Sequence, residues 1–244
     1  PLWQDLHRYL ATAATACAMC GGFARHVSAE AVARAMGAGD GLEESDALAG
    51  GYNITPGRPI LTAHADPVSA ALRLALDHWG FHPHWAGSDA PSPINARAET
   101  VATSPYFRDA FAHRRCLIPA NGWFEWQATD AGKQPWYFTA ADAPLIAYAG
   151  IWTEAPEDRT EAGRSCAIIT EPARGIARSV HPRMPLVLDP GCWASWLDPH
   201  LTARADIRRA VQRLDPEALE AWPVSPRVNR PSEDDPALLE PVEP

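Results

Sequence analysis

The segments Leu145–Trp152 (LIAYAGIW) and Ser165–Thr170 (SCAIIT) are the most apolar stretches of this 244-residue chain. Short apolar runs rich in isoleucine and aromatic residues are typical of buried β-strands, so we expect both to be central strands. The 24 prolines and 16 glycines are spread along the chain rather than clustered. This distribution favours many short elements joined by turns over a long helical bundle.

Further strands and short helices are predicted on both sides of these segments. The strands are Cys20–Ala24, Pro59–Ala63, Ala71–Trp79, Cys116–Pro119, Trp123–Trp126, Pro135–Ala140, Leu186–Leu188 and Trp222–Ser225. The helices are Ser28–Met36, Tyr106–Arg115, Trp193–Leu197 and Ala203–Leu214, with a helical turn at Arg174–Val180. Residues 80–93 are predicted to form a long loop, and loops of this length are often functional.

The composition sets broad limits on the class of protein. A hydrophobic content of 46% is enough for one sizeable core or for two small domains. No run of about 18 apolar residues occurs, so we expect no transmembrane helix. The formal charge of -9 argues mildly against a general nucleic-acid binder. Only Lys133 is a lysine among 21 basic residues; arginine suits phosphate and carboxylate, but a GC-rich genome produces the same bias.

The five cysteines are irregularly spaced: Cys17, Cys20, Cys116, Cys166 and Cys192. An odd, irregular set argues against a disulfide framework and for a reducing cytoplasm. Cys17 and Cys20 form a C-x-x-C pair, which is a redox or metal-binding pattern. No clear helix follows this pair and no second close pair completes a set of four zinc ligands, which disfavours both interpretations.

Residues 1–18 resemble a leader rather than part of the domain. The stretch begins with proline, and its apolar segment is weak and interrupted by threonine. A signal peptide ending before Met19 is disfavoured for that reason. Two interpretations stay open: a mis-called start, with translation beginning at Met19, or a propeptide that is removed later.

The stretch Met19-Cys20-Gly21-Gly22-Phe23 carries the most unusual chemistry of the chain. Removal of Met19 gives Cys20 a free α-amine beside its thiol. Such a 1,2-aminothiol condenses with an aldehyde: the amine forms an imine, the thiolate adds to the imine carbon, and a thiazolidine closes. An α-amine titrates near ~8 and a free thiol near ~8.5, so both nucleophilic forms are accessible near neutrality.

Glu125 is the one charged residue in the aromatic strand Trp123-Phe124-Glu125-Trp126. Alternation along a strand places Trp123 and Glu125 on one face, and Phe124 and Trp126 on the other. A carboxylate flanked by aromatic rings is expected to be partly desolvated, which raises its pKa and suits general acid/base chemistry. The alternative is a glutamate on an edge strand in water.

Three other stretches contain candidate functional residues, and each also has a purely structural or solvent-exposed interpretation. Ile94–Thr100 places Asn95, Arg97 and Glu99 close together, but a helix start with solvated charges has the same composition. His181 stands beside Arg183 and between prolines at a strand entrance, where a lone histidine is more often structural than catalytic. His82-x-His84 is a candidate metal pair or a solvated pair in the 80–93 loop.

Six motifs occur in one order: Met19-Cys20-Gly21, Tyr52-Asn53-x-x-Pro56-Gly57, Trp79-Gly80-Phe81, Ile94-Asn95-Ala96-Arg97-Ala98-Glu99-Thr100, Gly122-Trp123-Phe124-Glu125-Trp126 and His181-x-Arg183-Met184-Pro185. Together they resemble the SOS response-associated peptidase (SRAP) family, also called abasic-site processing proteins. The resemblance implies a single α+β domain over residues 19–230, with a curved, barrel-like antiparallel sheet and flanking helices. It leaves residues 231–244 as an acidic C-terminal tail.

The resemblance also implies an activity and a set of residues. The protein would capture abasic sites in single-stranded DNA as a covalent thiazolidine on Cys20, after autoproteolytic exposure of that residue. Asn95 would hold the Cys20 terminus and the opened sugar, Glu125 would act as acid/base near the amine, and His181 would move a proton on the sugar oxygen. Arg97 and Arg183 would hold flanking phosphates, and Trp85 and Trp126 are candidates for stacking on neighbouring bases.

Several expectations accompany this resemblance. We expect no metal or organic cofactor, no membrane, a monomer, and a cytoplasmic protein at damaged DNA in the nucleoid. The family usually has arginine where this chain has Gly22. Without that arginine, phosphate binding would be weaker, or the contact would shift to Arg25. A retained leader would leave Cys20 with an amide nitrogen and prevent thiazolidine formation. The alternatives are a thiol peptidase acting on other proteins through Cys20 and His181, and a non-catalytic binder of single-stranded DNA.

Overall fold

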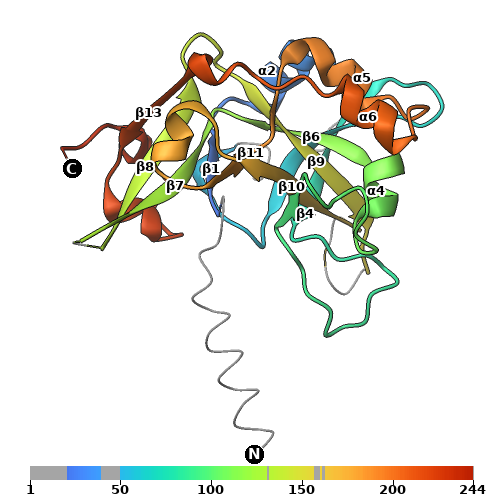
Figure 1. Cartoon of the computed structure of the whole chain (residues 1–244), viewed down its shortest axis with the longest axis horizontal. Coiled ribbons are helices and arrows are strands. Elements are labelled where there is room, and N and C mark those ends of the chain that lie inside the picture. Colours follow the sequence, from blue (N-terminus) through green and yellow to red (C-terminus); the bar gives the residue numbers. More distant parts are fainter. Residues whose placement is uncertain (1–20, 40–49, 131, 157–159, 161–162, 244) are drawn as a thin grey trace, which may run out of the picture.

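The computed structural model describes residues 21–39, 50–130, 132–156, 160 and 163–243 (Figure 1). The predicted leader, residues 1–18, and the predicted nucleophile Cys20 lie outside the described residues. Within the described ranges, no helix is long and apolar enough to span a membrane.

The strands form two sheets that are mostly antiparallel (Figure 1). The first has five strands in the order β13 (Leu219–Pro223), β8 (Gly132–Ala140), β7 (Gly122–Thr129), β1 (Phe23–Arg25) and β2 (Gly51–Ile54). The second has the order β11 (Arg183–Pro185), β10 (Arg164–Pro172), β4 (Leu72–Trp79), β3 (Pro59–Ala65), β6 (Arg115–Ala120), β9 (Ile146–Glu154) and β12 (Val187–Leu188), with β5 (Asn95–Arg97) paired to β10.

The second sheet closes on itself because β9 also pairs with β10. The strands β10, β4, β3, β6 and β9 therefore form a ring of hydrogen-bonded neighbours, which confirms the predicted α+β fold with a barrel-like sheet. Two pairings depart from the antiparallel expectation, since β10 runs parallel to both β4 and β5.

The two most apolar segments, Leu145–Trp152 and Ser165–Thr170, form the central strands β9 and β10. They pair from Arg164 opposite Glu154 to Ile168 opposite Gly150, and their core side chains are buried. Close packing explains Gly150: a Cβ there would lie 2.8 Å from both Cys116 Sγ and Ile118 Cδ1. Strands buried on both faces have no polar face, which is why these segments are apolar throughout.

Short helices cover the sheets and carry few residues each: α2 (Ala29–Met36), α4 (Arg108–His113), α5 (Trp193–Leu197) and α6 (Arg204–Ala210). The 3-10 helices are η1 (Gly175–Ser179), η2 (Pro190–Cys192), η3 (Pro216–Ala218), η4 (Pro226–Asn229) and η5 (Pro236–Leu239). Ser28 caps α2 by accepting a hydrogen bond from the Ala31 amide, and the helix ends at Gly37, whose φ of 71° is left-handed.

Two predicted helices are shorter than expected. The helix predicted over Tyr106–Arg115 is α4, Arg108–His113, because residues before it form turns and Arg115 already belongs to β6. The helix predicted over Ala203–Leu214 stops at Ala210 because the following chain pairs with β12, with the Leu214 amide donating to the Val187 carbonyl at 3.0 Å. Tertiary pairing overrides local helix propensity at both ends.

Arg115 ties the helical side of the molecule to the barrel. Its guanidinium donates to the carbonyl oxygens of Phe111, Ala112, Trp196, Asp198 and Leu201 over 2.6–3.0 Å. Burial lowers the pKa of Arg115 to about 10. The last carbonyl groups of a helix have no partner within the helix. This one buried side chain bonds to carbonyl groups near the ends of both α4 and α5 and in the chain that follows α5.

The acidic C-terminal stretch packs against β2. The side-chain amide of Asn53 donates to the carbonyls of Val228, Arg230 and Glu233, each at 3.1 Å. The Asp234 carboxylate in turn accepts a hydrogen bond from the backbone N–H of Asn53 at 3.0 Å. Leu238 is fully buried. These contacts attach the 226–239 segment to the same edge strand that borders the candidate site.

Candidate functional site

The site is built around the start of β1, to which position 20 is tethered. Gly22 lies between β7 and β2: its carbonyl accepts from the Phe124 amide at 3.0 Å, and a Cβ on it would be 3.7 Å from the Ile54 carbonyl. Glu125 follows Phe124 directly, so this hydrogen bond ties the start of β1 to the strand that carries Glu125.

Glu125 and His181 are brought together from distant parts of the chain. Glu125 follows Phe124 on β7 and is 1% exposed, while His181 is 8% exposed. The closest approach is 3.5 Å, between His181 Nδ1 and Glu125 Oε2. The strand alternation is as predicted, because Trp123 packs in one core cluster while Phe124 and Trp126 pack in another. Glu125 is thus the desolvated carboxylate of the two alternatives and not an edge residue in water.

The backbone of Arg183 fixes the His181 ring. Nδ1 lies 3.0 Å from the Arg183 carbonyl oxygen and 3.2 Å from its amide nitrogen. The residue itself follows η1, where its amide donates to the Ala177 carbonyl at 3.0 Å. A histidine held by its own neighbouring backbone presents its other ring nitrogen in a defined direction, as general acid/base chemistry requires.

Trp79 links the β1 region to Asn95. Its ring packs against Phe23 with centroids 5.3 Å apart, and its indole Nε1 donates to the Ile94 carbonyl at 2.9 Å. Asn95 follows directly, on β5, and is half-buried. Asn95 and Arg97 lie on one face of the strand, with buried Ala96 on the other. The alternative of a helix start with solvated charges is wrong, because this stretch forms a strand followed by turns.

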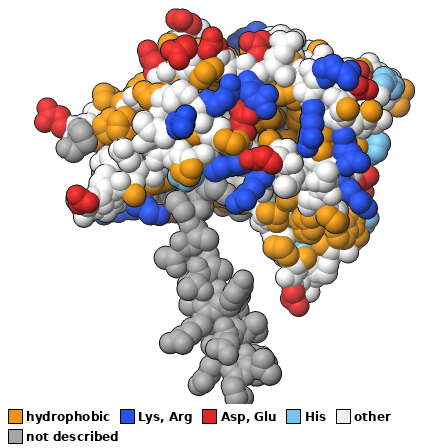
Figure 2. Space-filling view, in the orientation of Figure 1, with side chains coloured by type: hydrophobic (Ala, Val, Ile, Leu, Met, Phe, Trp, Pro, Cys, Tyr) orange, Lys and Arg blue, Asp and Glu red, His pale blue; other side chains and the backbone are white. Residues whose placement is uncertain are grey.

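The two predicted phosphate ligands differ in their surroundings. Arg97 is exposed, whereas the side chain of Arg183 is only 12% exposed. Arg183 forms a two-pronged ion pair with Glu99 and donates to the Thr170 carbonyl at 2.6 Å. Hydrogen bonding to Arg183 holds the pKa of Glu99 below its usual value. Basic side chains gather with acidic ones over this part of the fold, near β11 (Figure 2).

The two candidate stacking residues also differ. Trp85 is 60% exposed in the 80–93 loop, with its ring 5.5 Å from that of Tyr106 in an edge-on arrangement. Trp126 is half-buried, and its indole donates to Asn229 Oδ1 at 2.8 Å. Trp85 therefore presents a ring to solvent, and Trp126 presents part of one.

No metal centre is formed by the described part of the chain. His82 is 3% exposed with Nδ1 3.2 Å from Ser92 Oγ, while His84 is exposed. No group of three His, Cys, Asp or Glu side chains within the described ranges has the proximity that metal binding requires. Cys116, Cys166 and Cys192 are free and buried, and the C-x-x-C pair lies outside the described residues.

The comparison with known families decides the relationship. Residues 19–231 match the family described as SOS response associated peptidase (SRAP). The chain belongs to the SRAP family. The abasic site processing protein YoqW of Bacillus subtilis is 33% identical over 192 residues, covering 78% of this chain and 85% of YoqW. YedK of Escherichia coli, also an abasic site processing protein, is 32% identical over 201 residues, covering 79% and 85%.

Solved structures show the same fold. A protein from Bacteroides thetaiotaomicron superposes with a TM-score of 0.76 at 24% identity, covering 92% of this chain and all (100%) of that one. A phage-related protein from Bordetella bronchiseptica gives a TM-score of 0.68 at 31% identity, covering 84% and 94%. The five motifs that fall wholly within the described residues thus lie on an architecture shared with these solved structures.

Sequence reasoning missed the contacts by which Trp79 and Phe23 join parts of this candidate site. Both side chains are buried in the core, and an apolar aromatic residue in a sequence is ordinarily interpreted as core packing only. The signal that was available is the position of Trp79 as the first residue of the motif Trp79-Gly80-Phe81, and of Phe23 two residues after the motif Met19-Cys20-Gly21.

Proposed function

We propose that this SRAP-family chain captures abasic sites in single-stranded DNA as a covalent thiazolidine on Cys20. The observation that carries the proposal is the buried Glu125, 3.5 Å from His181, on the strand that hydrogen-bonds Gly22. A desolvated carboxylate beside a histidine supplies the proton transfers that imine chemistry at an aldehyde needs at neutral pH. The names of YoqW and YedK, both abasic site processing proteins, agree with this substrate.

The reaction balances as one condensation. An abasic sugar exists mostly as a closed hemiacetal, and His181 moves the proton that opens it to the aldehyde. The Cys20 amine attacks the aldehyde carbon, and Glu125 assists the loss of one water to give the imine. The Cys20 thiolate then adds to the imine carbon, and the ring nitrogen takes up a proton. Aldehyde plus aminothiol thus gives thiazolidine plus water, with no oxidant or reductant.

The remaining site residues position the strand. Asn95 holds the opened sugar beside the Cys20 terminus, and Arg97 and Arg183 contact flanking phosphates without selecting a sequence. Trp85 and Trp126 stack on bases beside the missing one, an interaction of about 1–3 kcal/mol per base. The peptidase activity in the family name is self-processing that exposes the Cys20 amine.

A denaturing gel with single-stranded DNA that contains one abasic site tests the proposal. Two proteins are compared: one beginning at Met19, and one carrying residues 1–18 through a link that cannot be cleaved. We expect a shifted band with the first protein only, and none after acetylation of its α-amine. No band with either protein at excess would overturn the proposal. A band that survives amine acetylation would assign the reaction to the thiol alone, as in a thiol peptidase.

A further inference from the structure

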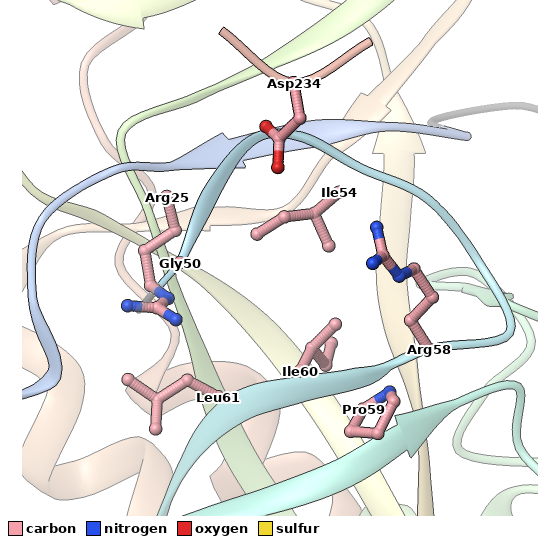
Figure 3. Close-up of a pocket in the computed structure, with 8 residues that line it drawn as sticks. All are labelled: Arg25, Gly50, Ile54, Arg58, Pro59, Ile60, Leu61 and Asp234. Carbon is pink, nitrogen blue, oxygen red and sulfur yellow. The ribbon is translucent and has the colours of Figure 1, made fainter. Parts of the chain in front are cut away.

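A pocket of about 150 Å³ lies between β2 and β3, on the margin of the candidate site (Figure 3). Ile54, Ile60 and Leu61 give it an apolar floor. Arg25 and Arg58 stand on opposite sides, with Asp234 at the rim (Figure 3). Asp234 is already engaged, since it accepts hydrogen bonds from the Tyr52 and Asn53 amides. The three charged side chains leave the pocket with an excess of positive charge.

The two arginines are not equivalent. Arg25 is 1% exposed, its Nη1 donates to the Val27 carbonyl at 2.8 Å, and burial lowers its pKa to about 10. A side chain enclosed in this way is not accessible to a DNA strand, so it does not take the phosphate contact that Gly22 lacks. Arg58 is exposed, and among the described residues its guanidinium has no hydrogen-bond or ion-pair partner.

The turn that carries Arg58 is bonded to the site. Gly57 donates to the Trp79 carbonyl and the Arg58 carbonyl accepts from the Trp79 amide, each at 2.9 Å. The Trp79 indole reaches Ile94, the residue before Asn95, at 2.9 Å. On the other side, Ile54 lines the pocket and its carbonyl lies 3.7 Å from the Cβ position of Gly22. The turn that carries Arg58 is therefore connected through Trp79 and Ile54 to the surroundings of both β5 and Gly22.

We infer that Arg58 binds a phosphate of the single-stranded DNA next to the abasic nucleotide. This inference rests on the proposed function. An exposed guanidinium without a protein partner loses nothing when it pairs with a phosphodiester, and its fork geometry suits two phosphate oxygens. Arg183 differs, because it must give up or share Glu99 to make the same contact.

The position of Gly22 offers a reciprocal test. A Cβ on Gly22 would meet Phe124 Cδ2 at 3.6 Å and Asn53 Oδ1 at 3.9 Å, both ordinary contacts, and its φ lies outside the left-handed region. The first carbon of an arginine at position 22 therefore fits without displacing the backbone. An arginine introduced there would start next to Ile54, which also lines the Arg58 pocket, so the inference predicts that it can replace the lost positive charge.

The experiment measures non-covalent binding first. The probe is a fluorescent single-stranded oligonucleotide with one tetrahydrofuran residue, which has no aldehyde, titrated at several salt concentrations. We expect Arg58→Ala to weaken binding about ten-fold. We also expect it to reduce the slope of log K against log salt by about 0.7, the value for one lost contact on a single strand. Arg58→Lys should keep the slope, and Gly22→Arg in the Arg58→Ala protein should restore both quantities.

Arg34→Ala is the matched control, since Arg34 is an exposed arginine on α2. The inference is overturned if Arg58→Ala binds the oligonucleotide with the affinity and salt slope of wild type. It is also overturned if Arg34→Ala loses as much affinity as Arg58→Ala. Thermal melting checks that each variant is folded, and Arg58→Gln repeats the test with a neutral side chain of similar length. A wild type that binds the probe but does not crosslink to an abasic strand refutes the proposed function and leaves the Arg58 test intact.

Discussion

Two buried pairs of a carboxylate and a histidine within the described residues differ in the side chains that hold them and in the distance between carboxylate and ring. Within the second sheet, Asp77 has no exposed side-chain surface and lies 2.8 Å from His64. Thr62 Oγ1 at 2.8 Å and Arg164 Nε at 2.7 Å bond to the same carboxylate. At the site, Glu125 and His181 are 3.5 Å apart, and the backbone of Arg183 rather than a cation holds the histidine.

This difference separates a structural pair from one suited to chemistry. Burial alone would raise the pKa of Asp77, but charge and hydrogen bonding from His64 and Arg164 hold it below its usual value. A carboxylate bonded by three side chains cannot exchange protons without breaking the network. The Glu125–His181 separation of 3.5 Å is longer than an ordinary N–H···O hydrogen bond, so this contact is looser than the 2.8 Å contact between Asp77 and His64.

The largest expected effect is on stability, from Asp77→Asn. The variant leaves the Arg164 guanidinium and His64 without their buried counter-charge, and breaking a buried pair costs about 3–5 kcal/mol of unfolding free energy. Chemical denaturation at neutral pH measures it. The rate of crosslinking to an abasic strand, measured well below the melting temperature, should stay close to that of wild type. A loss below about 1 kcal/mol would show that Asp77 is not a structural anchor.

The next effect is on rate, from Glu125→Gln, which keeps the shape of the side chain and removes its charge. We expect crosslinking to slow by about 10²-fold, the lower end for loss of a general acid/base, while the unfolding free energy changes less than in Asp77→Asn. Quenched time courses on denaturing gels give the rate. Asp77→Asn is the matched control, because it removes a carboxylate charge from the other buried pair.

The comparison would fail if the two variants exchanged their effects. A Glu125→Gln protein that is strongly destabilised but crosslinks normally would make Glu125 the structural member. His181→Gln gives an independent check. It should slow the reaction on a closed abasic sugar more than on a simple open-chain aldehyde, because the proposed role of His181 is to open the ring.

The apolar pattern predicted the central strands and the family resemblance implied the barrel, but neither predicted where the elements end. β9 and β10 are apolar because both faces are buried, and that pattern is local. The end of α6 at Ala210 is decided by pairing of the following chain with β12, to which the local sequence gives no clue. The same holds for Asn53, whose amide is bonded to carbonyls 175–180 residues away.

The candidate site likewise contains features that the local sequence predicts and features that depend on tertiary structure. The aromatic neighbours of Glu125 predict its burial, since strand alternation is a local property. The approach of His181 to Glu125 joins a strand to a segment more than fifty residues later, and only tertiary structure brings the two together. The exposure of Arg58 and the enclosure of Arg25 depend on the gap between β2 and β3, which no sequence pattern encodes.

The smallest expected effect is the response of stability to acid, which again distinguishes the two pairs. Because the pKa of Asp77 is lower in the folded protein, the unfolded chain binds more protons near its ordinary value of about 3.9. The stabilisation is therefore fully present above that value and is lost as pH falls through the folded pKa. The melting temperature of wild type should decline over this acid range, and that of Asp77→Asn should decline less. Parallel slopes for wild type and Asp77→Asn would instead assign acid sensitivity to other carboxylates, such as Glu99, whose pKa is also lowered by its arginine partner.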